Sequence, residues 1–213
     1  MKLLNKTKYL IIILTLSILP GFSQQDAKST QILEAMSKKY KALPSFNVLF
    51  SYRYGKEAPV MGELGVKGEK YFLKLTDQEI YNDSKAVATY LKESKEVTIQ
   101  DYSDDQNSSL NPAKIFTSYQ KGYKSAFVRT ITENGVALNV ISLTPVEKNS
   151  PLSKIELSIG QKDNALKTWK ITEKNGTAST YKIEKFDSSA ILNDKSFSFD
   201  SKKYPDVEVV DLR

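Results

Sequence analysis

The stretch VKGEKYFLKL, residues 66–75, decides which class of fold this chain can form. Alternate side chains of an extended strand point to opposite faces, so the stretch has an apolar side and a mostly charged side. The apolar side consists of Tyr71, Leu73 and Leu75, and the other side consists of Lys70, Phe72 and Lys74. The pattern predicts a half-buried strand that rests on a hydrophobic core on one side only.

The same alternation continues along most of the chain. FNVLFSYRY (residues 46–54) and GELGVKG (residues 62–68) each place large apolar side chains on one face. Short apolar stretches separated by turn residues follow, including the Asn-Gly pairs at 134–135 and 175–176. The connections are too short for crossover helices, so we expect one antiparallel sheet of about eleven strands.

Only two helices are expected. Residues 27–42 repeat apolar side chains at spacings of three and four, and Pro44 ends this pattern. Residues 111–122 predict a second, short helix between Asn111 as cap and Gly122 as stop. A long twisted sheet with so little helical cover tends to curl. The predicted fold is therefore mainly β (α+β): an incomplete antiparallel β-barrel with a helical lid over a hydrophobic cavity.

Two groups of apolar residues are candidates for a binding site in such a barrel. The concave face is expected to be lined by Phe46, Val48, Phe50, Tyr52, Leu64, Val66, Tyr71 and Leu73. The lid helices are expected to present Ile32, Leu33, Met36, Ile115, Phe116 and Tyr119. Periodicity alone is equally typical of a closed β-sandwich, in which these residues would fill an ordinary core.

Residues 1–23 have the features of a secretory signal peptide. Three lysines precede an apolar run, and small residues, Gly21 and Ser23, stand where a signal peptidase cleaves. The run is shorter than the ~20 residues that a membrane-spanning helix needs, which argues against an uncleaved anchor. We expect cleavage after Ser23, export, and a single domain over residues 24–213.

The chain contains no Cys and no His, which excludes several functional classes. Catalytic triads with His, cysteine nucleophiles, thiolate or imidazole zinc sites and the usual haem sites all need these residue types. Carboxylate-pair and Ser-Lys catalysis remain chemically possible, but no motif for either is recognisable. We therefore expect no enzymatic activity, no metal and no cofactor.

The charge balance does not favour a nucleic-acid partner. Three of the 31 Lys and Arg residues lie in the expected signal peptide, which leaves 28 against 25 Asp and Glu. Nucleic-acid binders typically carry a basic stripe with arginines, whereas this chain has three arginines and mixes its charges. We expect a monomer without a nucleic-acid partner.

Five stretches carry a resemblance to a known family. They are ILEAMSKKYKALPSFNVLFSY, VKGEKYFLKLTDQEIYNDSKAVATYL, NPAKIFTSYQKGYK, EKNGTASTYKIEKF and KYPDVEVVDLR. In this order, over residues 27–213, the chain resembles the LolA-type periplasmic carriers of outer-membrane lipoproteins, in particular their Bacteroidetes branch.

The resemblance implies a carrier that holds the acyl chains of a lipoprotein in its cavity. Such a protein accepts the lipoprotein from an inner-membrane lipoprotein-releasing ABC transporter, crosses the periplasm, and delivers it to the outer membrane, to an acceptor there if one is present. It uses no cofactor. The apolar stripes of the lid would fill the cavity while it is empty. The same resemblance leaves open a related lipid or glycolipid carrier, or an envelope-stress sensor of the same fold.

One position departs from the family pattern. In better-known enterobacterial carriers, an arginine that helps to control the lid follows the Val-Lys pair of the opening stretch, where this chain has Gly68. The role of that arginine is therefore not transferred to this chain. Arg53 and Arg129 are expected to face solvent, and Trp169 is expected to fill the core.

Overall fold

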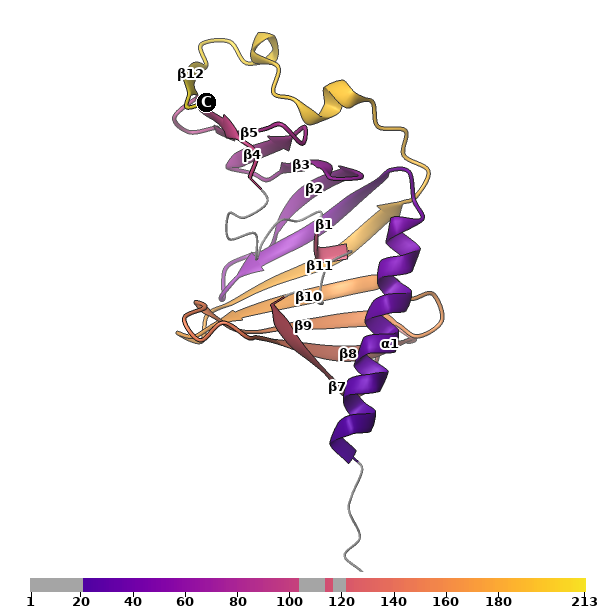
Figure 1. Cartoon of the computed structure of the whole chain (residues 1–213). Coiled ribbons are helices and arrows are strands. Elements are labelled where there is room, and N and C mark those ends of the chain that lie inside the picture. The colour runs from indigo at the N-terminus through magenta and orange to yellow at the C-terminus, as the bar shows by residue number, and fades with distance from the viewer. Residues whose placement is uncertain (1–20, 104–113, 117–121) are drawn as a thin grey trace, which may run out of the picture.

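The computed structural model describes residues 21–103, 114–116 and 122–213, which form one α-helix and one twelve-stranded sheet (Figure 1). The elements are α1 (Gly21–Lys41), β1 (Phe46–Tyr54), β2 (Val60–Lys67), β3 (Lys70–Lys74), β4 (Gln78–Asn82), β5 (Ala86–Leu91), β6 (Glu96–Asp101), the 3₁₀ turn η1 (Lys114–Phe116), β7 (Tyr123–Glu133), β8 (Val136–Pro145), β9 (Leu152–Gly160), β10 (Leu166–Glu173), β11 (Ala178–Asp187), the 3₁₀ turns η2 (Asp194–Phe197) and η3 (Ser201–Lys203), and β12 (Glu208–Asp211).

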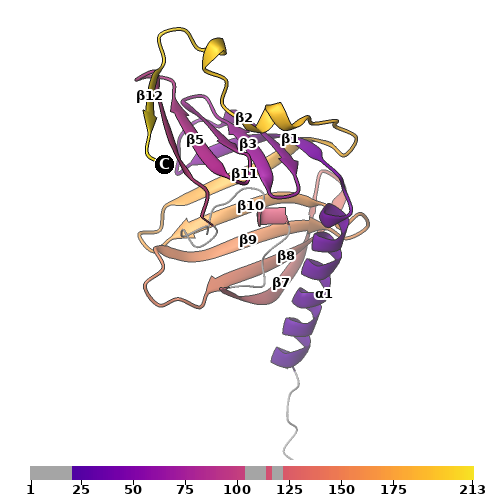
Figure 2. The same ribbon diagram turned by 45° about the horizontal axis from the view of Figure 1, so that its top comes forward.

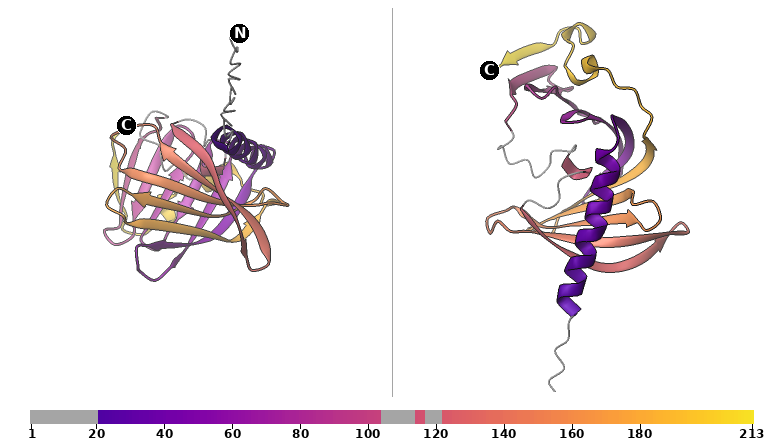
Figure 3. Two further views of the ribbon diagram at one scale, coloured as in Figure 1. Left: turned by 90° about the horizontal axis from the view of Figure 1, so that it is seen from below. Right: turned by 45° about the vertical axis from the view of Figure 1, so that its right-hand side comes forward.

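The sheet consists of two antiparallel meanders joined through β1. The strand order is β12-β6-β5-β4-β3-β2-β1-β11-β10-β9-β8-β7, so β7 and β12 are its two edges and the barrel is not closed. Figures 2 and 3 show the sheet curved around η1, with α1 beside one open side. This arrangement confirms the predicted fold class of an incomplete, mainly β barrel.

The last strand differs from the predicted pairing. β12 runs parallel to β6, whereas the other neighbouring strands of the described sheet are antiparallel. Residues 188–207 lead from β11 to β12 and cross the outside of β2–β6 (Figure 1). We call residues 188–213, which follow β11 and include η2, η3 and β12, the strap.

Turn residues fix the register of the hairpins. Asn134 and Gly135, between β7 and β8, both have positive φ, at 49° and 77°, which is the conformation of a type I′ turn. Gly68, between β2 and β3, has φ +60°, and a Cβ atom added at this position would have no neighbouring atom within 4 Å. The Asn-Gly turn therefore lies where the sequence pattern predicts it, whereas the turn at Gly68 divides residues 66–75, predicted as one strand, between the end of β2 and β3.

The helical elements agree with the prediction in part. α1 begins at Gly21, earlier than the predicted residue 27, and ends at Lys41, before Pro44. Of the predicted second helix the structure describes only η1; Asn111, Pro112 and Tyr119 lie outside the described residues, as do residues 1–20 of the predicted signal peptide. Within the described ranges, no helix has the length and apolar character needed to span a bilayer.

The sheet packs on both of its faces. The larger cluster lies on the concave face, between the strands, α1 and η1. A second cluster lies on the outside of β3–β6, where the strap covers it, and includes Phe72, Tyr81, Tyr90 and Phe197. The expectation that Phe72 belongs to a solvent-facing side of its strand is therefore wrong, because Phe197 packs against it with ring centroids 6.1 Å apart.

Candidate functional site

The eight residues predicted for the concave face lie together on that face. Strand pairing forms the rows Phe46–Val66–Tyr71 and Val48–Leu64–Leu73, and Phe50 and Tyr52 follow along β1. Six of the eight are buried, while Tyr52 and Leu73 are partly buried against them. Alternation along three neighbouring strands thus produces one continuous apolar wall.

The predicted lid residues that the structure describes belong to the same cluster. Leu33 and Met36 of α1 and Phe116 of η1 are buried in it, with Ile32 and Ile115 partly buried beside them. Tyr119 lies outside the described residues. The structure therefore brings the described members of both predicted groups into one packed cluster.

An aromatic centre holds α1, η1 and the sheet together. The ring of Phe116 lies 4.7 Å from Tyr40 of α1, 5.2 Å from Phe46 of β1 and 6.3 Å from Trp169 of β10, measured between centroids. Phe116 and Tyr40 are almost fully buried. The first pair is tilted and the other two are edge-to-face, and such pairs add stabilisation beyond the area that they bury.

The second half of the cluster comes from β7–β11, whose inward residues the sequence analysis did not name, apart from Trp169. Pairing aligns one row across seven strands: Val60, Tyr52, Tyr181, Trp169, Leu157, Ile141 and Phe127. Burial, together with the neighbouring Tyr52 ring, raises the pKa of Tyr181 to about 12. The alternation in KIELSIG and LKTWKITE is the signal that predicts these positions.

α1 is fixed to the sheet by polar contacts along its length. The backbone N–H of Leu166 donates to the Tyr40 hydroxyl at 3.0 Å, and Lys39 Nζ donates to the Asp163 carbonyl at 3.0 Å. Nearer the start of α1, Ser29 Oγ and Ser125 Oγ on β7 lie 2.8 Å apart. Burial is the main cause that raises the pKa of Tyr40 to about 12.

The chemistry of the concave cluster is apolar. Among the described residues the one buried acidic side chain is Glu79, which belongs to the outer side of the sheet beneath the strap. No group of three or more potential metal ligands occurs in the described ranges. A face of aliphatic and aromatic side chains, whose side-chain polar atoms are tyrosine hydroxyls and the indole nitrogen of Trp169, can bind hydrocarbon.

Comparison with protein families identifies the chain at this point. Residues 74–200, more than half of the chain, match the family described as outer membrane lipoprotein carrier protein LolA. The chain belongs to the LolA family. The matched range begins at the end of β3 and ends between η2 and η3. It therefore contains strands β4–β11 of the sheet and part of the strap.

Solved structures resemble this LolA-family chain at low sequence identity. An uncharacterized conserved protein from Thermus thermophilus is 11% identical with a TM-score of 0.59, over 86% of this chain and 99% of the other. A LolA superfamily protein from Nitrosomonas europaea is 13% identical with a TM-score of 0.41, over 80% and 97%. No curated protein sequence matches this chain.

The departure from the LolA pattern at Gly68 has a structural counterpart. Gly68 stands in the turn between β2 and β3, outside both strands, and its positive φ would strain any larger residue. Arg53 and Arg129 are both exposed. No arginine among the described residues therefore belongs to the concave cluster.

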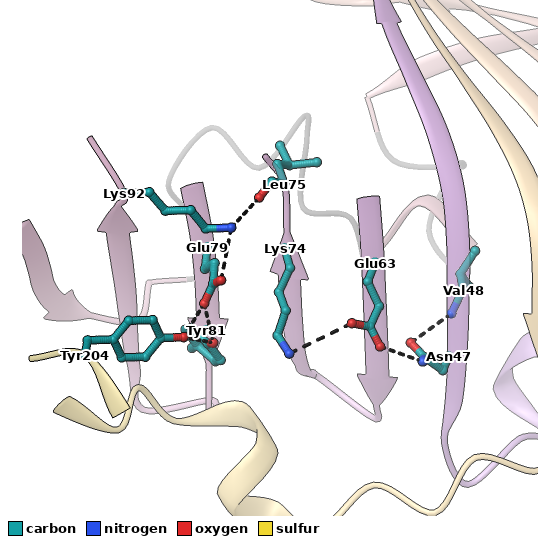
Figure 4. A network of polar contacts seen from close by, with 9 residues as sticks. All are labelled: Asn47, Val48, Glu63, Lys74, Leu75, Glu79, Tyr81, Lys92 and Tyr204. Atoms are coloured by element: carbon teal, nitrogen blue, oxygen red, sulfur yellow. Dashed lines mark hydrogen bonds and ion pairs between the residues drawn. The ribbon is translucent and has the colours of Figure 1, made fainter. Parts of the chain in front are cut away.

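A polar network joins the strap to the outer side of the sheet (Figure 4). Tyr204 of the strap and Tyr81 of β4 both donate hydrogen bonds to Glu79 Oε2, the second at 2.7 Å. Lys92 Nζ lies 3.2 Å from Glu79 Oε1 and donates to the Leu75 carbonyl at 2.7 Å. Burial raises the pKa of Glu79, but the hydrogen bonds from Tyr204, Tyr81 and Lys92 outweigh it and hold the pKa below its usual value.

Proposed function

We propose that this LolA-family protein is a periplasmic carrier that binds the acyl chains of lipoproteins in its concave apolar cluster. It takes lipoproteins from an inner-membrane ABC transporter and delivers them to the outer membrane. The observation that carries the proposal is one apolar cluster, shared by the sheet, α1 and η1, in a chain of the lipoprotein carrier family. Export by the signal peptide of residues 1–23 belongs to the same proposal.

The free energy of exposing an acyl chain explains why a carrier is needed. A chain of ~15 methylene groups costs on the order of 12 kcal/mol in water, at ~0.8 kcal/mol for each group. A triacylated lipoprotein multiplies this cost about threefold, so it cannot cross an aqueous compartment unaided. The concave cluster supplies enough enclosed apolar surface to offset part of that cost, provided that its walls separate.

The lid is the part of the cluster that we propose to move. Leu33 and Met36 of α1 and Phe116 of η1 fill the centre of the cluster. Acyl chains would take the places of these side chains, so that the empty and loaded forms are two states of one element. The contacts of Tyr40 with Leu166 and of Ser29 with Ser125 must then be exchanged during loading.

Binding of a synthetic triacylated lipopeptide tests the proposal. Trp169 is the only tryptophan and lies in the cluster, so its emission reports occupation of the site. We expect saturable binding of the lipopeptide and no binding of the same peptide without acyl chains. Native mass spectrometry of the protein from periplasm should show a co-purifying lipoprotein; absence of binding in both experiments would reject the carrier function.

A disulfide between α1 and β7 tests the lid separately. The Oγ atoms of Ser29 and Ser125 lie 2.8 Å apart, so the pair Ser29→Cys and Ser125→Cys can form a disulfide with little movement. The chain has no other cysteine. Oxidation should abolish loading and a reductant should restore it, while Ser29→Cys alone should load in both conditions. Loading of the oxidised double variant would show that α1 is not the lid.

A further inference from the structure

Charged residues are divided unequally between two parts of the molecule. The part that contains α1 from residue 27 onward, β1 and β7–β11 (residues 27–59 and 122–187) carries 16 Lys and Arg against 9 Asp and Glu. The part that contains β2–β6 and the strap (residues 60–101 and 188–213) carries 10 against 13. The formal charges of these two parts are therefore +7 and −3. This difference is not evident along the sequence, where basic and acidic residues are interspersed.

Five of these 16 cations lie together on the outer side of the sheet. Tyr52, Tyr181 and Trp169 point into the concave cluster, so their neighbours along each strand point outward. The outward cations of this region, which we call the basic face, are Arg53 of β1, Lys154 of β9, Lys170 of β10, and Lys182 and Lys185 of β11. Pairing sets Arg53 and Lys170 on either side of Thr180, and Lys182 directly opposite Thr168.

Acidic side chains neutralise only part of the basic face. Lys154 forms an ion pair with Glu156 at 3.1 Å, and Lys182 with Glu184 at 3.5 Å. Arg53, Lys170 and Lys185 are exposed, and none of them forms an ion pair with another described residue. Asp187 at the end of β11 interacts electrostatically with Lys185. The face therefore keeps an excess of about two positive charges at neutral pH.

Two exposed apolar side chains border the basic face. Leu49 on β1 is paired with Lys185, and Met61 on β2 is paired with Ser51, which is itself opposite Lys182. Their exposed fractions are 38% and 55%. Apolar side chains beside lysines are typical of surfaces that lie in the interface of a membrane.

We propose that the basic face docks on an anionic membrane surface, with phospholipid phosphates as its ligand. Four of its five cations are lysines, whose flexible, strongly hydrated charges suit a mobile layer of phosphates better than bidentate recognition of a fixed carboxylate. Protein interfaces are usually depleted of lysine, which disfavours an acidic protein as the partner. The net negative part, with β2–β6 and the strap, is disfavoured as the docking surface. The inference stands apart from acyl-chain binding, since it uses the opposite side of the sheet.

Vesicle flotation with the whole protein tests the docking surface. Vesicles containing phosphatidylglycerol should carry the protein at low salt, and vesicles of phosphatidylcholine alone should not. Raising the ionic strength to about 0.5 M should release the protein, because salt screens exposed charges beyond a few ångströms. Failure to bind phosphatidylglycerol vesicles at low salt would overturn the proposal.

Matched lysine variants separate the basic face from net charge. The triple variant Lys170→Gln, Lys182→Gln, Lys185→Gln should bind phosphatidylglycerol vesicles about a hundredfold more weakly, at about a fivefold loss for each lysine. The control Lys85→Gln, Lys95→Gln, Lys202→Gln changes the net charge equally in the other part, where all three lysines are exposed, and should bind like the wild type.

Two outcomes would contradict the assignment. An equal loss in both triple variants would show that only net charge matters. Tighter binding to soluble polyglutamate than to the vesicles would show an acidic protein to be the better partner. Circular dichroism of both variants should match the wild type, because substitutions at exposed positions rarely change stability by more than about 0.5 kcal/mol.

Discussion

The indole of Trp169 stacks on the ring of Tyr181, with centroids 4.6 Å apart and an angle of 4° between the two planes. Phe50 and Phe116 approach the same indole from β1 and η1, at 6.1 and 6.3 Å. Trp169 therefore stands where the two halves of the sheet and the described part of the predicted second helix meet. The same ring contacts therefore contribute to stability and belong to the proposed binding site.

Truncating Trp169 should be strongly destabilising. We expect Trp169→Ala to lower the free energy of unfolding by about 3–5 kcal/mol, because it leaves a cavity among packed rings. Trp169→Phe keeps an aromatic ring against Tyr181 and should cost clearly less. Urea unfolding followed by circular dichroism measures both variants, and an alanine variant as stable as the wild type would contradict the central position of this side chain.

Stability should fall steeply with pH in the alkaline range. The pKa values of Tyr40 and Tyr181 are raised to about 12 in the folded protein, whereas the ordinary value is 10.0. The stabilisation is complete below pH 10 and is lost between about pH 10 and 12, because the unfolded chain releases these protons first. Each residue accounts for about 2–3 kcal/mol over this range.

Removing both hydroxyl groups checks the alkaline prediction. The variant Tyr40→Phe, Tyr181→Phe should show a flatter dependence of its unfolding free energy on pH above 10 than the wild type does. Its stability at neutral pH should also be lower, since the backbone N–H of Leu166 loses its acceptor on Tyr40. Parallel pH profiles of the two proteins would show that these two hydroxyls do not cause the decline.

The concave wall was predictable because its signal is local. In β1, β2 and β3 each inward residue is apolar or glycine, although the turn at Gly68 interrupts the stretch that was predicted as one strand. Alternation therefore fixes which side chains share a face before the pairing of strands is known. The same reasoning places Leu33 and Met36 on the buried stripe of α1.

The outer cluster was not predictable from local patterns. Phe72 stands near two lysines of its own strand, and the residue that covers it, Phe197, lies in a segment with neither helical nor strand periodicity. The parallel pairing of β12 with β6 depends on the same segment. The strap is irregular and its contacts are non-local, so they produce no periodic pattern in the sequence. Glu79 and Tyr204 could therefore not be recognised as hydrogen-bond partners.

Two glycines of β2 allow aromatic rings to lie on the strand, one on each face. A methyl group on Gly65 would come within 2.2 Å of the Phe72 ring, and one on Gly62 within 2.4 Å of the Phe50 ring. We expect Gly65→Ala and Gly62→Ala each to cost about 1–3 kcal/mol, because the rings must move within packed clusters.

The two glycine variants should differ in a spectroscopic signal. Phe50 contacts Trp169, so Gly62→Ala should shift the tryptophan emission, whereas Gly65→Ala acts on the outer cluster and should leave it unchanged. Adding Phe72→Leu to Gly65→Ala should recover part of the lost stability, and a double-mutant cycle measures this coupling. Additive effects would contradict the assigned contact with Phe72.

Glu79 should make the docking of the strap sensitive to acid. Its folded pKa lies below the ordinary value, so its contribution to stability is present above the unfolded pKa of about 4.5 and is lost as the pH falls through the folded pKa.

Tyr204→Phe removes one donor to this carboxylate and should cost about 1–3 kcal/mol at neutral pH. In a Glu79→Gln background the same change should cost less, and unfolding free energy should fall less steeply between about pH 5 and 3. Urea unfolding at several pH values measures the stability of the wild type, the two single variants and the double variant. If the wild type and Glu79→Gln lost stability equally in acid, the carboxylate would not be what holds Tyr204 and the strap in place.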